Sequence, residues 1–268
     1  MSTSGAEGLS YTNSGDRRRP AVLFLHGFMG SSADWEDVMG ALEGRFYCIA
    51  ADLPGHGASL GLPDEAYTIE GAARRILEVP GELGIGRAAL VGYSMGGRLA
   101  LYLALRHPAR CAGLFLESAS PGLESLEERR SRRETDERRA RRLETEDFGR
   151  FLEDWYRQPL FASLARDETL LARTIEARRR NDPGELARSL RGMGTGNQPS
   201  LWGELPGLQV PALAVAGGLD EKYAGISRLM ANLNPLLESV VVPGVGHNVH
   251  IEAFEAYLAS LRDFLDTL

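Results

Sequence analysis

The pentapeptide Gly92-Tyr93-Ser94-Met95-Gly96 constrains the fold of this chain more than any other stretch. An apolar run at 88–91 precedes it and a helical pattern at 98–106 follows it. A serine between small residues at a strand-to-helix turn predicts a nucleophile elbow, because such a turn strains the backbone and crowds its neighbours. Ser94 would then stand at a helix N-terminus, where free N–H groups favour developing negative charge.

Short apolar runs alternate with helical patterns on both sides of the elbow, which indicates a mostly parallel sheet flanked by helices. The N-terminal residues 1–20 are polar and predict a mobile tail or a short edge strand. The expected strands are 21–25, 46–50, 88–91, 112–117, 210–216 and 238–242, and the expected helices are 31–42, 68–83, 98–106, 223–233 and 252–268. The predicted class is α/β. The elbow, His26-Gly27-Phe28 and Asp52-x-Pro54-Gly-His-Gly-x-Ser59 resemble motifs of the α/β-hydrolase superfamily, and this resemblance implies the α/β-hydrolase fold.

The alternation stops after residue 120. Residues 121–205 are highly charged, rich in arginine and helical in pattern, and they contain no convincing buried strand. A segment of this length is too long for a plain loop. We therefore expect a helical cap at 121–205, inserted into a core made of 1–120 and 206–268.

Composition excludes several classes of function. The net charge of -7 argues against nucleic acid as a bulk electrostatic partner. No apolar run approaches the roughly 20 residues that span a bilayer, so no membrane insertion is expected. The polar N-terminal stretch lacks the apolar region of a signal peptide, which predicts a cytoplasmic protein. Nothing in the sequence indicates an oligomeric state.

A serine needs a neighbouring base before it can react, and the chain offers one in the order typical of this architecture. Asp220 and His247 each follow an expected strand, so they should meet Ser94 at the carboxyl edge of the sheet. The predicted triad is Ser94, Asp220 and His247. Glu117, at the end of an earlier strand, is the alternative acid, and His250 is a candidate supporting group.

Backbone N–H groups are expected to complete the site. The N–H of Met95 follows the nucleophile, and that of Phe28 follows His26-Gly27 after the first expected strand, so both are oxyanion-hole candidates. The sequence has no spacing typical of metal ligands and no Gly-rich dinucleotide loop. We therefore predict neither a metal site nor a cofactor.

Arg98 is unusual for an esterase. It lies four residues after Ser94 on the same expected helix, and residues four apart share a helix face. A guanidinium there would bind a substrate carboxylate, unless it extends outward as a structural group. The predicted cap adds the arginine clusters 129–133 and 178–180, of which most should be solvated and ion-paired. These arginines favour a small anionic polycarboxylate as substrate.

Several motifs together resemble those of the 2-succinyl-6-hydroxy-2,4-cyclohexadiene-1-carboxylate synthase family of menaquinone biosynthesis. The resemblance runs from about residue 20 to the end of the chain and includes the cap. It rests on Gly92-Tyr-Ser-Met-Gly-Gly-Arg98, Glu117-Ser-Ala-Ser-Pro-Gly-Leu123, Asp154-Trp-Tyr-x-x-Pro-Leu-Phe161, Gly192-Met-Gly-Thr-Gly-x-Gln-Pro199 and Gly246-His-Asn-x-His250.

This resemblance implies a lyase that eliminates pyruvate from 2-succinyl-5-enolpyruvyl-6-hydroxy-3-cyclohexene-1-carboxylate, with Ser94 as the base. It also implies substrate-binding residues, with Arg178 the least certain because Arg179 and Arg180 adjoin it. Trp155 and Phe161 have cap packing as their alternative role. Two other hypotheses about the function stay open: a serine hydrolase that acts on an anionic substrate, and a non-catalytic binding protein. The implied substrate-binding residues are Tyr93, Arg98, Arg132, Trp155, Phe161 and Arg178.

Overall fold

A seven-stranded sheet forms the centre of the computed structural model, which describes residues 8–268. The strands lie in the order β1-β3-β2-β4-β5-β6-β7, and only the edge strand β1 is antiparallel to its neighbour. The predicted edge strand is therefore present as β1, while the tail expected at residues 1–7 lies outside the described residues. The strands are β1 Tyr11–Ser14, β2 Ala21–Leu25, β3 Tyr47–Ala51, β4 Ala88–Tyr93, β5 Cys111–Glu117, β6 Ala212–Gly217 and β7 Leu237–Val242.

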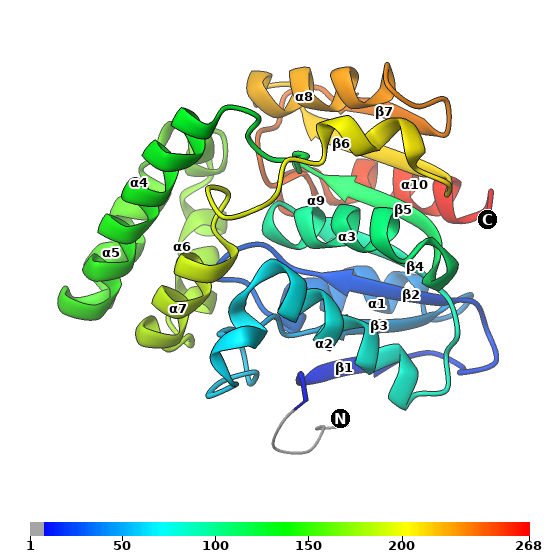
Figure 1. The fold of residues 1–268 in the computed structure, drawn as a ribbon, viewed down its shortest axis with the longest axis horizontal. Coiled ribbons are helices and arrows are strands. Elements are labelled where there is room, and N and C mark those ends of the chain that lie inside the picture. Colours follow the sequence, from blue (N-terminus) through cyan, green and yellow to red (C-terminus); the bar gives the residue numbers. More distant parts are fainter. Residues whose placement is uncertain (1–7) are drawn as a thin grey trace.

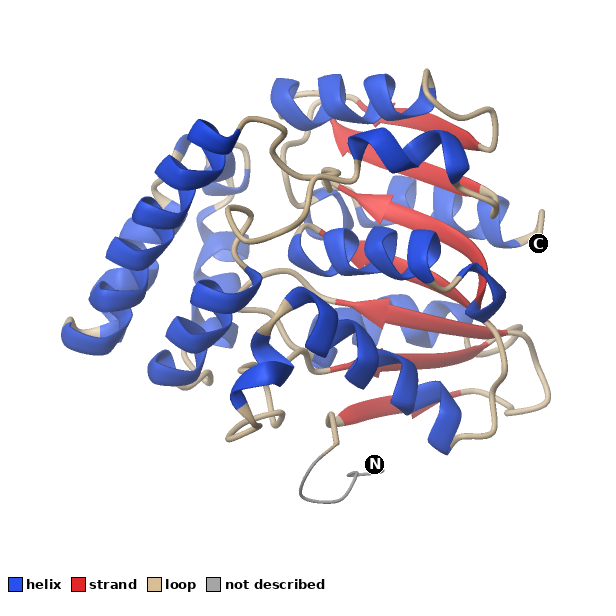
Figure 2. Ribbon diagram, viewed as in Figure 1, coloured by secondary structure: helices blue, strands red, loops and turns tan. Residues whose placement is uncertain are grey.

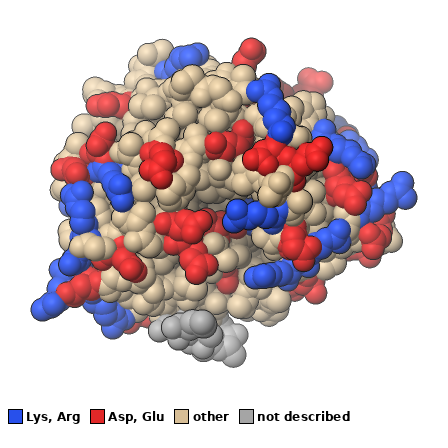
Figure 3. Space-filling model, turned by 180° about the vertical axis from the view of Figure 1, so that it is seen from behind, with Lys and Arg blue, Asp and Glu red and all other residues tan. Residues whose placement is uncertain are grey.

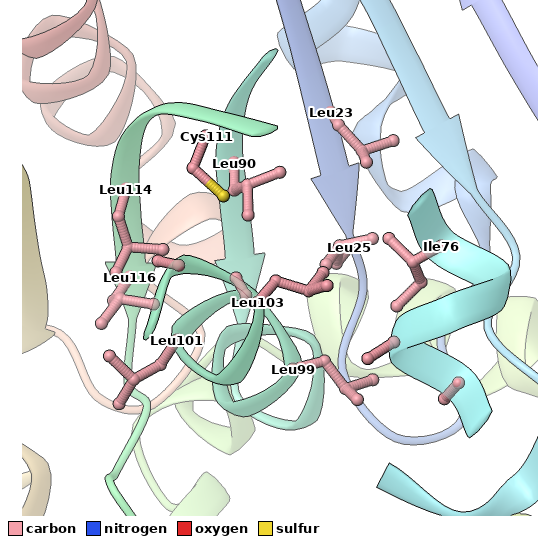
Figure 4. Close-up of a cluster of buried hydrophobic side chains, with 14 of the residues drawn as sticks. Leu23, Leu25, Ile76, Leu90, Leu99, Leu101, Leu103, Cys111, Leu114 and Leu116 are labelled. Carbon is pink, nitrogen blue, oxygen red and sulfur yellow. The ribbon is translucent and has the colours of Figure 1, made fainter. Parts of the chain in front are cut away.

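Helices cover both faces of the sheet, so the middle strands are buried on both sides (Figure 2). This burial explains why β2 to β6 are continuous apolar runs and do not alternate with polar residues. One face carries α2 (Ile69–Glu82), α3 (Met95–Arg106) and α8 (Glu221–Ala231), and the other carries α1 (Glu36–Leu42) and α10 (Phe254–Leu265). Figure 4 shows leucines of β2, β4 and β5 meeting those of α3.

The ends of several helices follow from local capping. The helix α2 begins after Thr68, whose Oγ1 accepts the Gly71 N–H at 3.0 Å, so the predicted start is close. The predicted helix at 252–268 is divided into α9 (Val249–Glu252) and α10 by Ala253, whose φ of -141° is not helical. The 3₁₀ helices are Ser32–Trp35, Asp64–Tyr67, Pro108–Arg110, Pro159–Phe161, Leu164–Arg166 and Trp202–Gly207.

Four helices lie between β5 and β6 in the chain, and they gather outside the carboxyl ends of the parallel strands (Figure 1). An aspartate caps the N-terminus of each of the last three by accepting a backbone N–H. We call these four the cap helices: α4 Leu126–Thr145, α5 Phe148–Tyr156, α6 Glu168–Arg178 and α7 Pro183–Met193.

The cap helices have an apolar cluster of their own, which includes Phe151, Leu152, Phe161 and Leu186 and which also takes in Met29 from the core. The chain then returns to the sheet through Leu201 and Leu205, whose side chains join the main core. The boundary expected after residue 205 thus falls within the last 3₁₀ helix.

The surface of the cap is charged but not of one sign. The helix α4 buries only Asp136, Ala140 and Leu143, and its arginines pair with glutamates one turn away. Acidic and basic side chains are interspersed over the face drawn in Figure 3. None of the helices within residues 8–268 is long and apolar enough to cross a membrane.

Candidate active site

Ser94 occupies the turn between β4 and α3 with φ 49° and ψ -105°, in a left-handed region that a serine rarely adopts. Its N–H donates to the Glu117 carbonyl at 2.8 Å. A Cβ on Gly96 would lie 2.2 Å from the Leu25 carbonyl oxygen, and one on Gly92 would meet the Gly96 backbone. Close backbone approach therefore requires both glycines of the motif, and the result is the strained elbow that the sequence predicts.

The side chain of His247 links Ser94 to a carboxylate. Its Nε2 lies 3.2 Å from Ser94 Oγ, and its Nδ1 lies 2.6 Å from Asp220 Oδ2. The backbone of His247 is held by Ser118 Oγ, which donates to the His247 carbonyl at 2.8 Å. With Nδ1 donating to the carboxylate, Nε2 is free to accept the proton of the serine. The histidine and the aspartate are almost fully buried.

Glu117, the alternative acid, contacts a different histidine. Its fully buried carboxylate accepts the His250 N–H at 3.1 Å and lies 2.8 Å from His250 Nδ1. His250 in turn stacks on Trp35 with ring centroids 5.0 Å apart. The geometry therefore gives His247 the aspartate as its partner and gives the glutamate a second, separate pair behind the site.

Two backbone N–H groups beside Ser94 have no acceptor within residues 8–268, those of Phe28 and Met95. Met95 is the first residue of α3, whose N–H cannot bond within the helix. The turn before Phe28 is fixed by His26, whose Nε2 accepts the Leu53 N–H at 2.9 Å and whose Nδ1 lies 2.7 Å from the Gly27 carbonyl. Burial lowers the pKa of His26, in keeping with a neutral structural ring.

Every pocket residue expected from the sequence lines one cavity of about 280 Å³ next to Ser94. Trp155 and Phe161 contribute to its wall and also pack within the cap, because the Trp155 ring lies 5.9 Å from Phe151 and 6.4 Å from Phe161. The expected residues on this wall are Phe28, Tyr93, Ser94, Met95, Arg98, Arg132, Trp155, Phe161, Arg178 and His247.

Tyr93 is held in place from behind. Its hydroxyl donates to Asn248 Oδ1 at 2.6 Å, and its ring lies between His247 and His250. Burial, followed by the charge of Glu117, raises the pKa of Tyr93 well above its ordinary value. The phenol is therefore neutral, and its ring packs against both histidine rings.

Arg98 is a buried cation without a buried anion. Its Nη1 donates to the Met193 carbonyl at 2.9 Å and to Gln198 Oε1 at 3.1 Å. Within residues 8–268 no carboxylate lies at ion-pair distance from it, although only 8% of the residue is exposed. Burial, then the charge of Arg132, lowers the pKa of Arg98 to about 10, so the guanidinium is still charged at neutral pH.

The two cap arginines differ from Arg98 because each already has a carboxylate. Arg178 is buried, forms an ion pair with Asp34 at 2.5 Å and donates to the Tyr156 hydroxyl at 3.3 Å. Its neighbours Arg179 and Arg180 are exposed, so Arg178 is the residue of this cluster that lines the cavity. Arg132 donates through Nε to both oxygens of Asp136, at 2.8 and 2.9 Å.

Opposing effects act on the Arg178–Asp34 pair. Burial alone would raise the pKa of Asp34, but the charge and hydrogen bond of Arg178 outweigh it and hold that pKa below its ordinary value. Burial likewise opposes the charge on Arg178, and Asp34 reverses this effect and raises the pKa of the guanidinium. Both groups are therefore ionised in the folded protein.

Sequence reasoning missed several residues of the cavity wall, among them Arg139, Tyr223 and Lys222. Arg139 lies 5.1 Å above the Trp155 ring and donates to Gln158 Oε1 at 2.7 Å. It follows Arg132 by seven residues, which is two helical turns, so the helical period could have indicated it. Tyr223 packs edge-on against His247 at 4.8 Å, and Lys222 adjoins it. Both come within three residues of Asp220.

The cavity is strongly basic in its described part. Five basic side chains line it, with Asp34 as the one acidic side chain on the same wall. No group of three or more histidines, cysteines or carboxylates within residues 8–268 is placed to hold a metal ion. The arrangement combines a serine within hydrogen-bond distance of a buried histidine–aspartate pair, two N–H donors without an acceptor in residues 8–268, and more basic than acidic side chains.

The chain is similar to known proteins over most of its length. The family model described as alpha/beta hydrolase fold matches residues 20–254. A Serratia proteamaculans (strain 568) protein named 2-succinyl-6-hydroxy-2,4-cyclohexadiene-1-carboxylate synthase is 34% identical over 255 residues, which are 94% of this chain and 95% of the relative. A Bacillus subtilis (strain 168) protein carries the same name preceded by the word "Putative". It is 35% identical over 268 residues, which are 98% of this chain and 97% of the relative.

A solved structure agrees in shape as well. The protein named MenH from S. aureus superposes with a TM-score of 0.91 at 31% identity, and the match covers 96% of this chain and 98% of that one. The resemblance therefore includes the cap helices as well as the sheet.

Proposed function

The chain belongs to the 2-succinyl-6-hydroxy-2,4-cyclohexadiene-1-carboxylate synthase family of the α/β-hydrolase fold, and we propose that it catalyses the elimination of pyruvate that the sequence resemblance implies. The substrate would be 2-succinyl-5-enolpyruvyl-6-hydroxy-3-cyclohexene-1-carboxylate. Its three carboxylates suit a cavity with five basic side chains and one acidic one.

Arg98 is the observation that supports this substrate class best. A buried charge without a partner is costly, and the cost is recovered when a counter-ion binds. Gln198 and the Met193 carbonyl orient the guanidinium but leave its charge uncompensated. A carboxylate bound in this cavity would complete the pair, whereas a neutral ester would leave Arg98 unpaired.

In the proposed reaction Ser94 acts as a base. Its Oγ, 3.2 Å from His247 Nε2, would pass its own proton to the histidine while it takes the proton from ring carbon 2. The C2–H electrons form the C2–C3 double bond, the ring alkene shifts to C4–C5, and the C5–O bond breaks. The enolpyruvate that leaves takes up a proton to become pyruvate, so hydrogen, charge and electrons balance.

The two free N–H groups would stabilise the charge that develops during this step. Carbon 2 is adjacent to the succinyl carbonyl, so loss of its proton delocalises negative charge on to that oxygen. The N–H groups of Phe28 and Met95 have no other acceptor in the described chain and would donate to it. Asp220 would hold His247 in the required tautomer and stabilise the imidazolium.

Hydrolysis of an anionic ester is the second candidate. Ser94 in its strained turn, with His247 Nε2 at 3.2 Å, has the geometry of a nucleophile as well as of a base. The same fold supports both chemistries, so only the substrate distinguishes them.

A coupled assay separates the two candidates. The enolpyruvyl substrate is supplied to the purified protein, pyruvate is followed, and p-nitrophenyl esters are tested in parallel. Release of one pyruvate per substrate, with weak ester turnover, supports the lyase. Ester hydrolysis at ordinary enzyme rates without pyruvate release supports the hydrolase and rejects the lyase.

A further inference from the structure

Lys222 is the only lysine in a chain whose other basic residues are all arginine. It lines the same cavity as Ser94 and His247 while remaining exposed to solvent, which places it at the rim of that cavity. The one lysine ammonium group of the protein therefore lies beside its candidate active site.

Its position on α8 is electrostatically unfavourable. Asp220 caps this helix, its Oδ1 accepting the Tyr223 N–H at 3.3 Å, so Lys222 is the second residue of the first turn. The N-terminus of a helix carries partial positive charge, and cations are disfavoured there. Stability alone would favour an acidic residue such as the adjacent Glu221.

No carboxylate within residues 8–268 compensates this charge. The described ion pairs do not include Lys222, and its Nζ lies 5.4 Å from the centroid of the Tyr223 ring. Asp220, two residues before it, is engaged with His247 and with the α8 backbone. The ammonium group thus lies at the opening with its hydrogen-bonding capacity unused by the protein.

We propose that Lys222 binds a carboxylate of the substrate at the rim of the cavity, so that the substrate is bound through carboxylates at two separate points, α3 and α8. Arg98 on α3 supplies the buried point, and Lys222 on α8 supplies the exposed one. This assignment rests on the proposed polycarboxylate substrate, because a monoanion would not need both.

Kinetics of three variants test the assignment. Lys222→Gln should raise KM for the enolpyruvyl substrate about tenfold, the usual cost of one charge-assisted hydrogen bond, with little change in kcat. Lys222→Arg should restore most of the loss. Arg228→Gln removes an exposed positive charge further along the same helix, away from the cavity, and should leave KM within twofold.

The single lysine also allows a direct test of contact. Acetylation of Lys222 by an N-hydroxysuccinimide ester, followed by mass spectrometry, should slow severalfold in the presence of saturating 2-succinylbenzoate. This aromatic dicarboxylate has the carboxylate and succinyl groups of the expected product. The chain's α-amino group, whose labelling should not change, provides the internal reference.

The two tests separate failure of this assignment from failure of the proposed function. Unchanged KM in Lys222→Gln together with unprotected labelling, in a protein that releases pyruvate, would overturn the role of Lys222 alone. Protection of Lys222 by the dicarboxylate in a protein that releases no pyruvate would uphold the anion contact and reject the lyase. A protein that releases no pyruvate and whose Lys222 is not protected by the dicarboxylate would reject both the lyase and the role of Lys222.

Discussion

Arg98 Nη1 donates to Oε1 of Gln198 at 3.1 Å, and the same amide donates through Nε2 to the Ser120 carbonyl at 3.3 Å. Gln198 is completely buried, so its amide is fixed with the oxygen toward the guanidinium. A neutral residue thereby orients the cation without cancelling its charge. This relationship supports the proposal that Arg98 is an anion site, because no carboxylate of the described residues forms an ion pair with it.

Replacing Gln198 with Glu tests this view with almost no change in shape. The new carboxylate would pair with Arg98 and compete with the substrate, so KM should rise by at least about tenfold. Gln198→Met, which removes the acceptor but adds no charge, should raise KM less. Urea unfolding of both variants checks that the fold persists, and substrate affinity in Q198E equal to that of the wild type would contradict the role of Arg98.

The two buried histidine–carboxylate pairs should respond differently to mutation. Asp220→Asn removes the group that holds His247 and should lower kcat by about 10⁴-fold, the order found when the acid of such a triad is lost. Glu117→Gln leaves Ser94 and His247 untouched, so it should keep kcat within a few fold while costing about 1–3 kcal/mol of stability. Steady-state kinetics and denaturant unfolding measure both, and the reverse pattern would make Glu117 the functional acid.

Because the backbone of Ser94 is strained, replacing this residue with glycine should increase the stability of the protein. With φ at 49°, Ser94→Gly should relieve part of a strain of about 1–3 kcal/mol and raise Tm. Ser94→Ala keeps the Cβ and should not gain this stability. Both variants should be inactive in the pyruvate assay. Equal Tm values for the glycine and alanine variants would mean that the turn stores no strain.

The Arg178–Asp34 pair predicts a pH-dependent stability. Asp34→Asn leaves a buried guanidinium unpaired and should cost about 3–5 kcal/mol at pH 7. Because the pKa of Asp34 is lowered by folding, this contribution is complete above the unfolded value of about 4 and is lost as the pH falls through the folded one.

Urea titrations at several pH values measure this effect. The difference in unfolding free energy between the wild type and D34N should shrink below pH 4. The double variant Asp34→Leu with Arg178→Met, which removes both charges, should recover much of the stability. A difference that does not change between pH 7 and pH 3 would contradict the ion pair.

Structural features that depend on neighbouring residues could be predicted from the sequence, whereas hydrogen-bond and ion-pair partners far apart in the chain could not. The elbow and the alternation of strands and helices depend on neighbouring residues, and both agree with the structure. The partner of Arg178 lies 144 positions away and that of Arg98 lies 100 positions away, so no periodicity indicates either.

The residues that sequence reasoning missed follow the same distinction. Arg139 obeyed the helical period of α4 but lay among many solvated arginines, and its half-buried position over the Trp155 ring distinguishes it. Tyr223 and Lys222 line the cavity because α8 begins at Glu221, directly after its cap Asp220, whereas the sequence predicted a start at about residue 223.

The most direct test of Ser94 as a base is the single-turnover rate of pyruvate formation from substrate with deuterium at ring carbon 2. The proposed elimination breaks this C–H bond, so the deuterated substrate should react more slowly by a primary isotope effect, and Ser94 should gain no mass. Equal rates for both substrates, together with a covalent adduct on Ser94, would contradict the elimination and establish nucleophilic chemistry in its place.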